Sequence, residues 1–274
     1  SMAKQKDGFL GEQALVLPPA IVQRMKTDPA TSILYITDIG YYPKAYNHFR
    51  ERDTPIDQYV FIYCTEGRGW FSLDGQKHPV VPNQYFILPA GLPHAYGADE
   101  KEPWTIYWIH FGGTLAPLYC THRICRLTDI KPGMHSRISY RTELFEEIFR
   151  VLKMGYSLEN LSYASSVFHH YLGSLRYLRE YREAFSEHRP AGEEDPVNAA
   201  IHYMKENLGK KLTLAELADY TGYSSSYFSN LFLKRTGYAP LSYFNQIKIQ
   251  KACQFLDFTD MKVNQVCYRV GIED

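Results

Sequence analysis

The sequence contains few cysteines, and none of them stands in a paired motif. The five are odd in number and show no CxxC spacing: Cys64, Cys120, Cys125, Cys253 and Cys267. An even set at regular spacing is typical of a disulfide-rich secreted domain, and CxxC pairs are typical of a structural zinc site. Neither class fits this chain, and we expect reduced structural thiols.

Long apolar runs and an export signal are also missing. No stretch approaches the roughly 18 consecutive apolar residues of a membrane-spanning helix. The start, Ser1-Met2-Ala3-Lys4, has no apolar signal region. With 45% hydrophobic and 22% charged residues among 274, the composition predicts a two-domain globular protein of the cytoplasm with no membrane partner.

The chain as a whole lacks net charge, because 30 Lys and Arg residues balance 30 Asp and Glu residues. This balance is uneven along the sequence. Between Pro196 and Gly271 there are nine basic and five acidic residues, a surplus of four (9 − 5 = 4). Such a local surplus is compatible with a nucleic-acid partner for the C-terminal part, although it does not establish one.

Residues 33–113 follow a period of two and are rich in tyrosine and valine. Turn sequences interrupt them at 66–69, 74–75 and 89–91. Many short strands with frequent glycine and proline turns predict an antiparallel barrel or sandwich.

From residue 136 to about residue 188 the pattern becomes helical, with two interleaved rows at seven-residue spacing. One row is Leu161, Phe168 and Leu175, and the other is Ala164, Tyr171, Leu178 and Phe185. This seam either packs on its own domain or pairs with the same helix of a second subunit. We favour the second hypothesis, which makes 116–188 a dimerisation segment, and we interpret 189–195 as a linker.

Two short stretches near the C-terminus repeat each other at an offset of 49 (263 − 214 = 49). Leu214, Leu217, Ala218, Gly222 and Tyr223 match Val263, Val266, Cys267, Gly271 and Ile272. An apolar triplet followed by glycine predicts the first half of a helix-turn-helix. A second helix is expected at about 225–235, but its counterpart would begin at the final residue, Asp274 (225 + 49 = 274). We therefore expect one complete helix-turn-helix and the front half of another, joined by a long helix from Pro240 to about Phe258.

Local signals support the complete copy. Thr213 and Glu216 form a capping-box signature, and Ser224 can cap the next helix. An all-helical interaction bundle without a DNA role is the alternative, which the repeat disfavours. On the expected second helix Phe228, Leu231 and Phe232 face inward, and the short polar side chains can reach base edges while the basic ones suit phosphates. The candidate DNA-binding residues are Ser225, Ser226, Ser229, Asn230, Lys234 and Arg235.

Four segments resemble the AraC/XylS family of bacterial transcription regulators: Leu212–Ala218, Tyr223–Phe232, Thr236–Pro240 and Val270–Asp274. The resemblance implies a DNA operator as partner and places Ser226, Ser229 and Asn230 at base-reading positions. RNA polymerase is left open as a further partner. Leu233 stands where the family usually has a basic residue, and Lys248 where it usually has arginine.

Residues 83–96 are similar to the second motif of cupin barrels, which include metalloenzymes and sugar-sensing domains. A metalloenzyme needs clustered ligands, such as an HxH pair with a glutamate and a further histidine. No HxH occurs in the sequence, and His94 is interpreted as a structural residue at a strand end. We expect no metal, no cofactor and no catalytic residue. A cupin-type enzyme with a helical appendage remains the alternative, which stoichiometric bound metal would favour.

Residues 103–113 resemble the end of the sensor barrel in the carbohydrate-responsive AraC branch. The period of two puts Trp104, Ile106, Trp108 and His110 on one face. An indole packs on the C–H face of a sugar while arginine, aspartate and tyrosine bind hydroxyls. The alternatives are barrel core for Trp108 and a solvated charge for Arg52. The resemblance implies Asp38, Arg52, Tyr96 and Trp108 as effector-binding residues, and the shared strand face adds Trp104 and His110.

These expectations combine into an α+β protein. A cupin-like antiparallel β-barrel with an N-terminal arm occupies 1–115, the helical segment 116–188, the linker 189–195, and an all-α DNA-binding domain 196–274. The predicted function is a homodimeric, sequence-specific DNA-binding regulator of carbohydrate-use genes. A mono- or oligosaccharide effector would shift the population between two arrangements of the dimer on DNA.

Overall fold

A computed structural model of the protein describes residues 3–73, 75–120, 125–130, 132, 136–184 and 195–272. Phe185, the predicted linker residues 189–194, the turn residue Asp74 and the terminal Asp274 lie outside these ranges. The chain divides into two compact units, residues 1–131 with 143–176 and residues 132–142 with 177–274. Mixed α+β architecture is confirmed, with the strands in the first unit and helices alone in the second.

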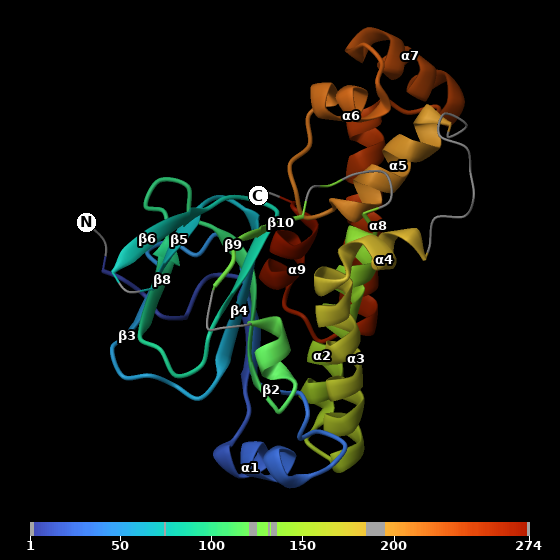
Figure 1. Cartoon of the computed structure of the whole chain (residues 1–274). Helices are drawn as coiled ribbons and strands as arrows, with labels where there is room; N and C mark the ends of the chain where they lie inside the picture. Colours follow the sequence, from blue (N-terminus) through green and yellow to red (C-terminus); the bar gives the residue numbers. More distant parts are fainter. Residues whose placement is uncertain are drawn as a thin grey trace. The chain divides into compact units, whose positions relative to one another are not determined.

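The strands of the first unit form two antiparallel sheets (Figure 1). Among the described residues, one sheet has the order β1 (Gln13–Val16), β2 (Tyr35–Tyr42), β9 (Thr105–Gly112), β4 (Tyr59–Glu66), β7 (Gln84–Leu88) and β10 (Thr128–Asp129). The other has the order β3 (Phe49–Arg52), β8 (His94–Ala98), β5 (Gly69–Leu73) and β6 (Gln76–Val80). The predicted antiparallel barrel is therefore present, and β1 adds a strand before the predicted region.

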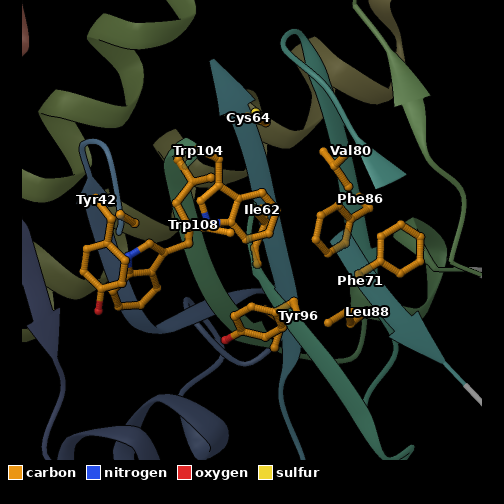
Figure 2. Packing of buried hydrophobic residues seen from close by; sticks show 14 of the residues in the cluster. Tyr42, Ile62, Cys64, Phe71, Val80, Phe86, Leu88, Tyr96, Trp104 and Trp108 are labelled. Carbon is orange, nitrogen blue, oxygen red and sulfur yellow. The ribbon is translucent and has the colours of Figure 1, made fainter. Parts of the chain in front are cut away.

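Large aromatic side chains from both sheets pack against one another in the space between them (Figure 2). Phe71 of β5 and Phe86 of β7 stack with ring centroids 4.4 Å apart. Trp108 of β9 lies across Gly40 of β2, where a Cβ atom would come within 2.4 Å of the indole. Glycine at this position therefore makes room for the Trp108 ring.

Helices α2 (Ile138–Met154) and α3 (Leu158–Arg176) bring aromatic side chains onto the outer face of the β1–β10 sheet. Phe168 of α3 meets Phe111 at 5.3 Å, and Tyr171 meets Phe61 at 5.7 Å. A further helix, α1 (Pro19–Thr27), follows β1. A helix that covers a sheet needs the same apolar period as a helix that pairs with another helix.

The seven-spaced seam is buried within its own chain, which corrects its interpretation as a seam for a partner helix. Its members on α3 are at most 4% exposed: Leu161, Ala164, Phe168, Tyr171 and Leu175. The physical reason is that outward-facing sheet aromatics already supply the apolar partner. The homodimer itself stays a prediction, with its interface elsewhere.

The second unit consists of α4 (Leu178–Glu183), α5 (Pro196–Glu206), α6 (Leu214–Thr221), α7 (Ser225–Thr236), α8 (Pro240–Phe258) and α9 (Val263–Val270), with the first residues of α2. The repeat is confirmed, because α6 and α9 begin and end 49 residues apart (263 − 214 = 49; 270 − 221 = 49). Gly222 and Gly271 end these helices in the left-handed conformation, with φ of 82° and 70°.

Side-chain caps fix the start of each helix in the first copy. Thr213 Oγ1 accepts a hydrogen bond from the Glu216 N–H at 3.2 Å, and Ser224 Oγ accepts one from the Tyr227 N–H at 3.3 Å. Phe228 and Phe232 have no exposed surface and form the centre of the helical core. The predicted helix-turn-helix is present as α6 and α7.

Two broader findings concern the described part of the chain. None of its helices is both long enough and apolar enough to cross a membrane. No group of three or more His, Cys, Asp and Glu side chains within it is arranged to hold a metal ion.

Candidate functional site

Arg52, His94 and Tyr96 form a hydrogen-bonded group on one face of the smaller sheet. Strands β3 and β8 pair with Arg52 opposite His94 and Arg50 opposite Tyr96, so all four residues share that face. Arg52 Nη1 lies 3.0 Å from His94 Nε2 and donates to the Tyr96 hydroxyl at 3.1 Å. Because a guanidinium can only donate, His94 Nε2 is the acceptor and the proton of the ring is on Nδ1.

Asp38 and His110 form a second polar group on the other sheet, where β2 and β9 place them opposite each other. His110 Nδ1 lies 3.5 Å from Asp38 Oδ1, and the Thr37 hydroxyl donates to the same oxygen at 2.6 Å. Burial raises the pKa of Asp38, but His110, Thr37 and the charge of Arg52 outweigh it and hold this pKa below its usual value. The charge of Arg52 therefore reaches the Asp38 carboxylate from the other sheet.

Trp108 lies beside these polar groups with its ring-nitrogen donor unused. Its indole is 5.3 Å from the His110 ring and 5.2 Å from the Tyr42 ring. Trp108 is 8% exposed, and its Nε1 is buried without a hydrogen-bond partner among the residues that the structure describes. A buried donor without a partner is costly, so this N–H is a candidate for binding a ligand or a water molecule.

Trp104 lies deeper and is already satisfied. It has no exposed surface, and its Nε1 donates to His48 Nδ1 at 3.0 Å. Burial, with smaller contributions from Arg50 and Arg52, lowers the pKa of His48 to about 3. A neutral ring at physiological pH is what the acceptor role toward Trp104 requires.

The other histidines of the site are also held neutral. Burial, with smaller contributions from Arg52 and His110, lowers the pKa of His94 to about 4. Burial also lowers the pKa of His110, against the opposing effect of Asp38. At neutral pH the charged side chains here are thus the two arginines and Asp38.

The structure brings most of the predicted effector residues together. Arg52 and Tyr96 lie on one face of the smaller sheet. Asp38, Trp108 and His110 lie on one face of the larger sheet, and Trp104 lies deeper in the core. Arg50, Tyr42 and His48 were not predicted from the sequence, and His94 was predicted to have only a structural role. The alternation Arg50-Glu51-Arg52 was an available signal, because a strand places its first and third residues on one face.

On the helical unit, the predicted DNA-binding residues lie on α7. Ser226, Asn230 and Lys234 are exposed, while Ser225 and Ser229 are half-buried. Tyr227, which the sequence analysis did not select, is 54% exposed on this helix. Its ring lies 5.0 Å from that of Tyr223.

Arg235, at the end of α7, is engaged within the chain. Its guanidinium forms an ion pair with Asp195, whose other oxygen caps α5 by accepting from the Val197 N–H at 3.1 Å. Asp195 is therefore the N-cap of a helix, although it was expected at the end of the linker. Lys234 makes no such pair with the described residues.

Two family models match the chain: an AraC-like ligand binding domain over residues 39–170 and a helix-turn-helix domain over residues 217–274. The MmsAB operon regulatory protein of Pseudomonas aeruginosa is 30% identical over 95% of this chain and 82% of its own length. This chain belongs to the AraC family of transcription regulators.

Further relatives agree with this assignment. The raffinose operon transcriptional regulatory protein of Pediococcus pentosaceus is 28% identical over 80% of this chain and 78% of its own length. The lactose operon transcription activator of Staphylococcus xylosus is 25% identical over 86% of this chain and 82% of its own length. The AraC-family chain is thus a DNA-binding regulator with a ligand-binding domain, and the alternative of a cupin-type enzyme is set aside.

Proposed function

We propose that this AraC-family regulator controls carbohydrate-use genes in response to a sugar-class effector bound between its two sheets. The observation that carries the proposal is the buried, unpartnered Trp108 Nε1 beside Asp38, Arg52 and Tyr96. An indole face with hydrogen-bonding side chains around it suits a pyranose. Two of the relatives are named for a raffinose and a lactose operon, which supports the same class.

Each side chain has a distinct proposed role at this site. Trp108 offers its ring to the C–H face and its N–H to a ring or hydroxyl oxygen, while Arg52 and Tyr96 bind hydroxyl groups. Asp38 accepts from hydroxyls, and His110 orients it. Trp104 is proposed to act from behind, through its hydrogen bond to His48.

The N-terminal arm is proposed to transmit effector binding. Phe9 is 6% exposed and packs on Tyr42 at 4.8 Å and on His48 at 5.3 Å. Tyr42 in turn contacts Trp108. An effector beside Trp108 would therefore change how firmly Phe9 is held, which biases a two-state arrangement of the regulator.

Removing the ring nitrogen of Trp108 tests the effector site. In Trp108→Phe we expect sugar affinity to fall about five- to tenfold, because a hydrogen bond from a buried donor is lost. Candidate sugars (galactose, glucose, lactose and raffinose) are titrated while tryptophan fluorescence and melting temperature are followed. A saturating sugar at 100 times its Kd adds about 2.7 kcal/mol of apparent stability to the wild type.

Tyr96→Phe removes the hydroxyl that accepts from Arg52 and should also weaken binding. Trp70→Phe is the matched control, since Trp70 is half-buried and packs against Phe49 and Lys77 instead. Sugar binding that survives both site substitutions at full strength would place the effector elsewhere in the protein.

We also propose that α7 reads the operator. Ser226 and Asn230 would contact base edges in the major groove, and Lys234 a phosphate. Ser225 and Ser229, at the half-buried margin, would contact the backbone of the same groove. Arg235 joins them when it exchanges Asp195 for a phosphate.

Asn230→Ala tests the base contact. A duplex is first selected from random sequence with the wild-type regulator, and affinities are then measured by fluorescence anisotropy at fixed salt. We expect the variant to lose about 1–3 kcal/mol on the selected duplex and to accept more bases at one position. Gln23→Ala, an exposed amide of α1, is the control. A uniform loss over all sequences would instead assign Asn230 to the phosphate backbone.

A further inference from the structure

Several hydrogen-bond donors of the effector site are unused among the described residues. Arg52 uses Nη1 for two uncharged acceptors, His94 and Tyr96. Its Nε and Nη2 groups make no hydrogen bond with the described residues, and neither does the Arg50 side chain. The N–H of Trp108 is a further unused donor.

Arg50 belongs to this site by strand register. It lies two residues before Arg52 on β3 and opposite Tyr96 of β8, whose hydroxyl accepts from Arg52. Besides burial, which is the larger cause, the charges of both arginines lower the pKa of His48 and of His110. Both guanidinium groups therefore act on the same small volume.

Negative charge at the site is limited. One oxygen of Asp38 is already engaged by His110 and Thr37. On the N-terminal arm, Asp7 and Glu12 act on Tyr42, and Glu12 is occupied by the N–H groups of Gly8 and Phe9 at 2.9 and 3.1 Å.

Neither arginine is neutralised by an ion pair. Among the residues that the structure describes, no carboxylate lies within ion-pairing distance of Arg50 or Arg52. Two guanidinium groups without an ion-pair partner thus act on this site, and Asp38 is the carboxylate on the facing sheet. A ligand that brings its own negative charge would supply the ion-pair partner that both arginines lack.

We infer that the effector carries an anionic group, a carboxylate or a phosphate, which Arg50 and Arg52 bind together with the N–H of Trp108. This inference rests on the proposed effector site and narrows its ligand to sugar acids or sugar phosphates. An anionic oxygen accepts hydrogen bonds without donating any, and guanidinium groups bind carboxylate and phosphate through paired N–H donors. A neutral hydroxyl would bring a donor to a site that already has unused donors.

The test compares sugars that differ only in the charged group. D-galactose, D-galacturonate and D-galactose 6-phosphate, with the matching glucose series and inorganic phosphate, are titrated into the full chain at constant ionic strength. Calorimetry and melting temperature are the readouts. We expect the acid or the phosphate to bind at least tenfold more tightly than the neutral sugar, and the two arms identify which anion the site takes.

Two arginine variants locate the anion site. In Arg50→Gln and Arg52→Gln we expect affinity for the anionic probe to fall about 10- to 100-fold, the factor produced by losing a charge-assisted hydrogen bond. Affinity for a neutral sugar should change far less in Arg50→Gln. Arg68→Gln is the control, because this exposed arginine pairs with Glu102. If Arg52→Gln fails to fold, Arg50→Gln carries the test, since the Arg50 side chain makes no hydrogen bond with the described residues.

The outcomes separate this inference from the proposed function. Neutral sugars that bind through Trp108 as tightly as their acids and phosphates would overturn the anionic group and leave the sugar site standing. If anionic probes bind equally well after substitution of Arg50, Arg52 and Trp108, both the anion site and the location of the effector are overturned. No binding by any probe of either charge would also overturn both.

Discussion

Replacing Lys248 by alanine is expected to destabilise the DNA-binding unit by about 3 kcal/mol or more. Lys248 of α8 is 5% exposed, and its Nζ donates to the carbonyls of Lys210 and Gly271 at 2.9 and 3.0 Å. The substitution leaves two carbonyl groups without this donor, and each buried group left unsatisfied costs about 1–3 kcal/mol. It also removes the ammonium from above the Phe244 ring, 4.4 Å away.

Urea unfolding measures this loss, and DNA affinity is followed in parallel because the carbonyl of Gly271 ends α9. Lys248→Arg is the control, since the longer guanidinium keeps donors for the same carbonyls. Lys248→Met separates packing from hydrogen bonding, because it retains the apolar stem and lacks the donor. If Met at this position is as stable as the wild type, the two hydrogen bonds contribute nothing net.

Acidification is expected to destabilise the ligand-binding unit, and His48 should account for much of the effect. The pKa of His48 is lowered from 6.5 to about 3 by burial first, and then by Arg50 and Arg52. Between these two pH values the unfolded chain binds a proton that the folded chain does not, so the free energy of unfolding falls as the pH falls. The slope approaches about 1.4 kcal/mol per pH unit below pH 6.5, so His48 alone contributes a loss of about 2 kcal/mol between pH 6.5 and 4.5.

His48→Gln tests this assignment, because glutamine can still accept from Trp104 Nε1 but does not titrate. The variant should show a shallower dependence of unfolding free energy on pH below 6.5, measured by urea unfolding at a series of pH values. His169→Gln, at an exposed position of α3, is the control. An unchanged pH dependence in His48→Gln would show that other groups cause the acid sensitivity.

The helix-turn-helix could be predicted almost to the residue because its signals are local. Thr213 and Ser224 cap the helices that follow them, and Gly222 supplies the left-handed turn between them. Each of these effects acts within four residues of chain. Because the repeat has a fixed offset, the boundaries of α6 also predicted those of α9.

The barrel site could be predicted only in part, because its geometry depends on pairing between distant residues. Arg52 hydrogen-bonds to His94, which lies 42 residues away in the sequence, and no local sequence pattern predicts the pairing of β3 with β8. Trp108, His110 and Arg50 were accessible through strand alternation, whereas the position of Arg50 opposite Tyr96 follows only from the register. The prediction that the seam on α3 pairs with a second subunit was wrong for a different reason, since the period of an apolar stripe does not reveal what covers it.

The ion pair between Arg235 and Asp195 has a consequence for how the regulator searches DNA under the proposed role of α7. Asp195 is bonded to the guanidinium that a phosphate would take, so it acts as a competing anion built into the protein. Every chance encounter with DNA must displace this competitor, whatever the sequence, and only a site that also satisfies Ser226 and Asn230 gives a compensating gain. A carboxylate that caps α5 thereby lowers the affinity for every DNA sequence, so a sequence that lacks the Ser226 and Asn230 contacts is bound only weakly.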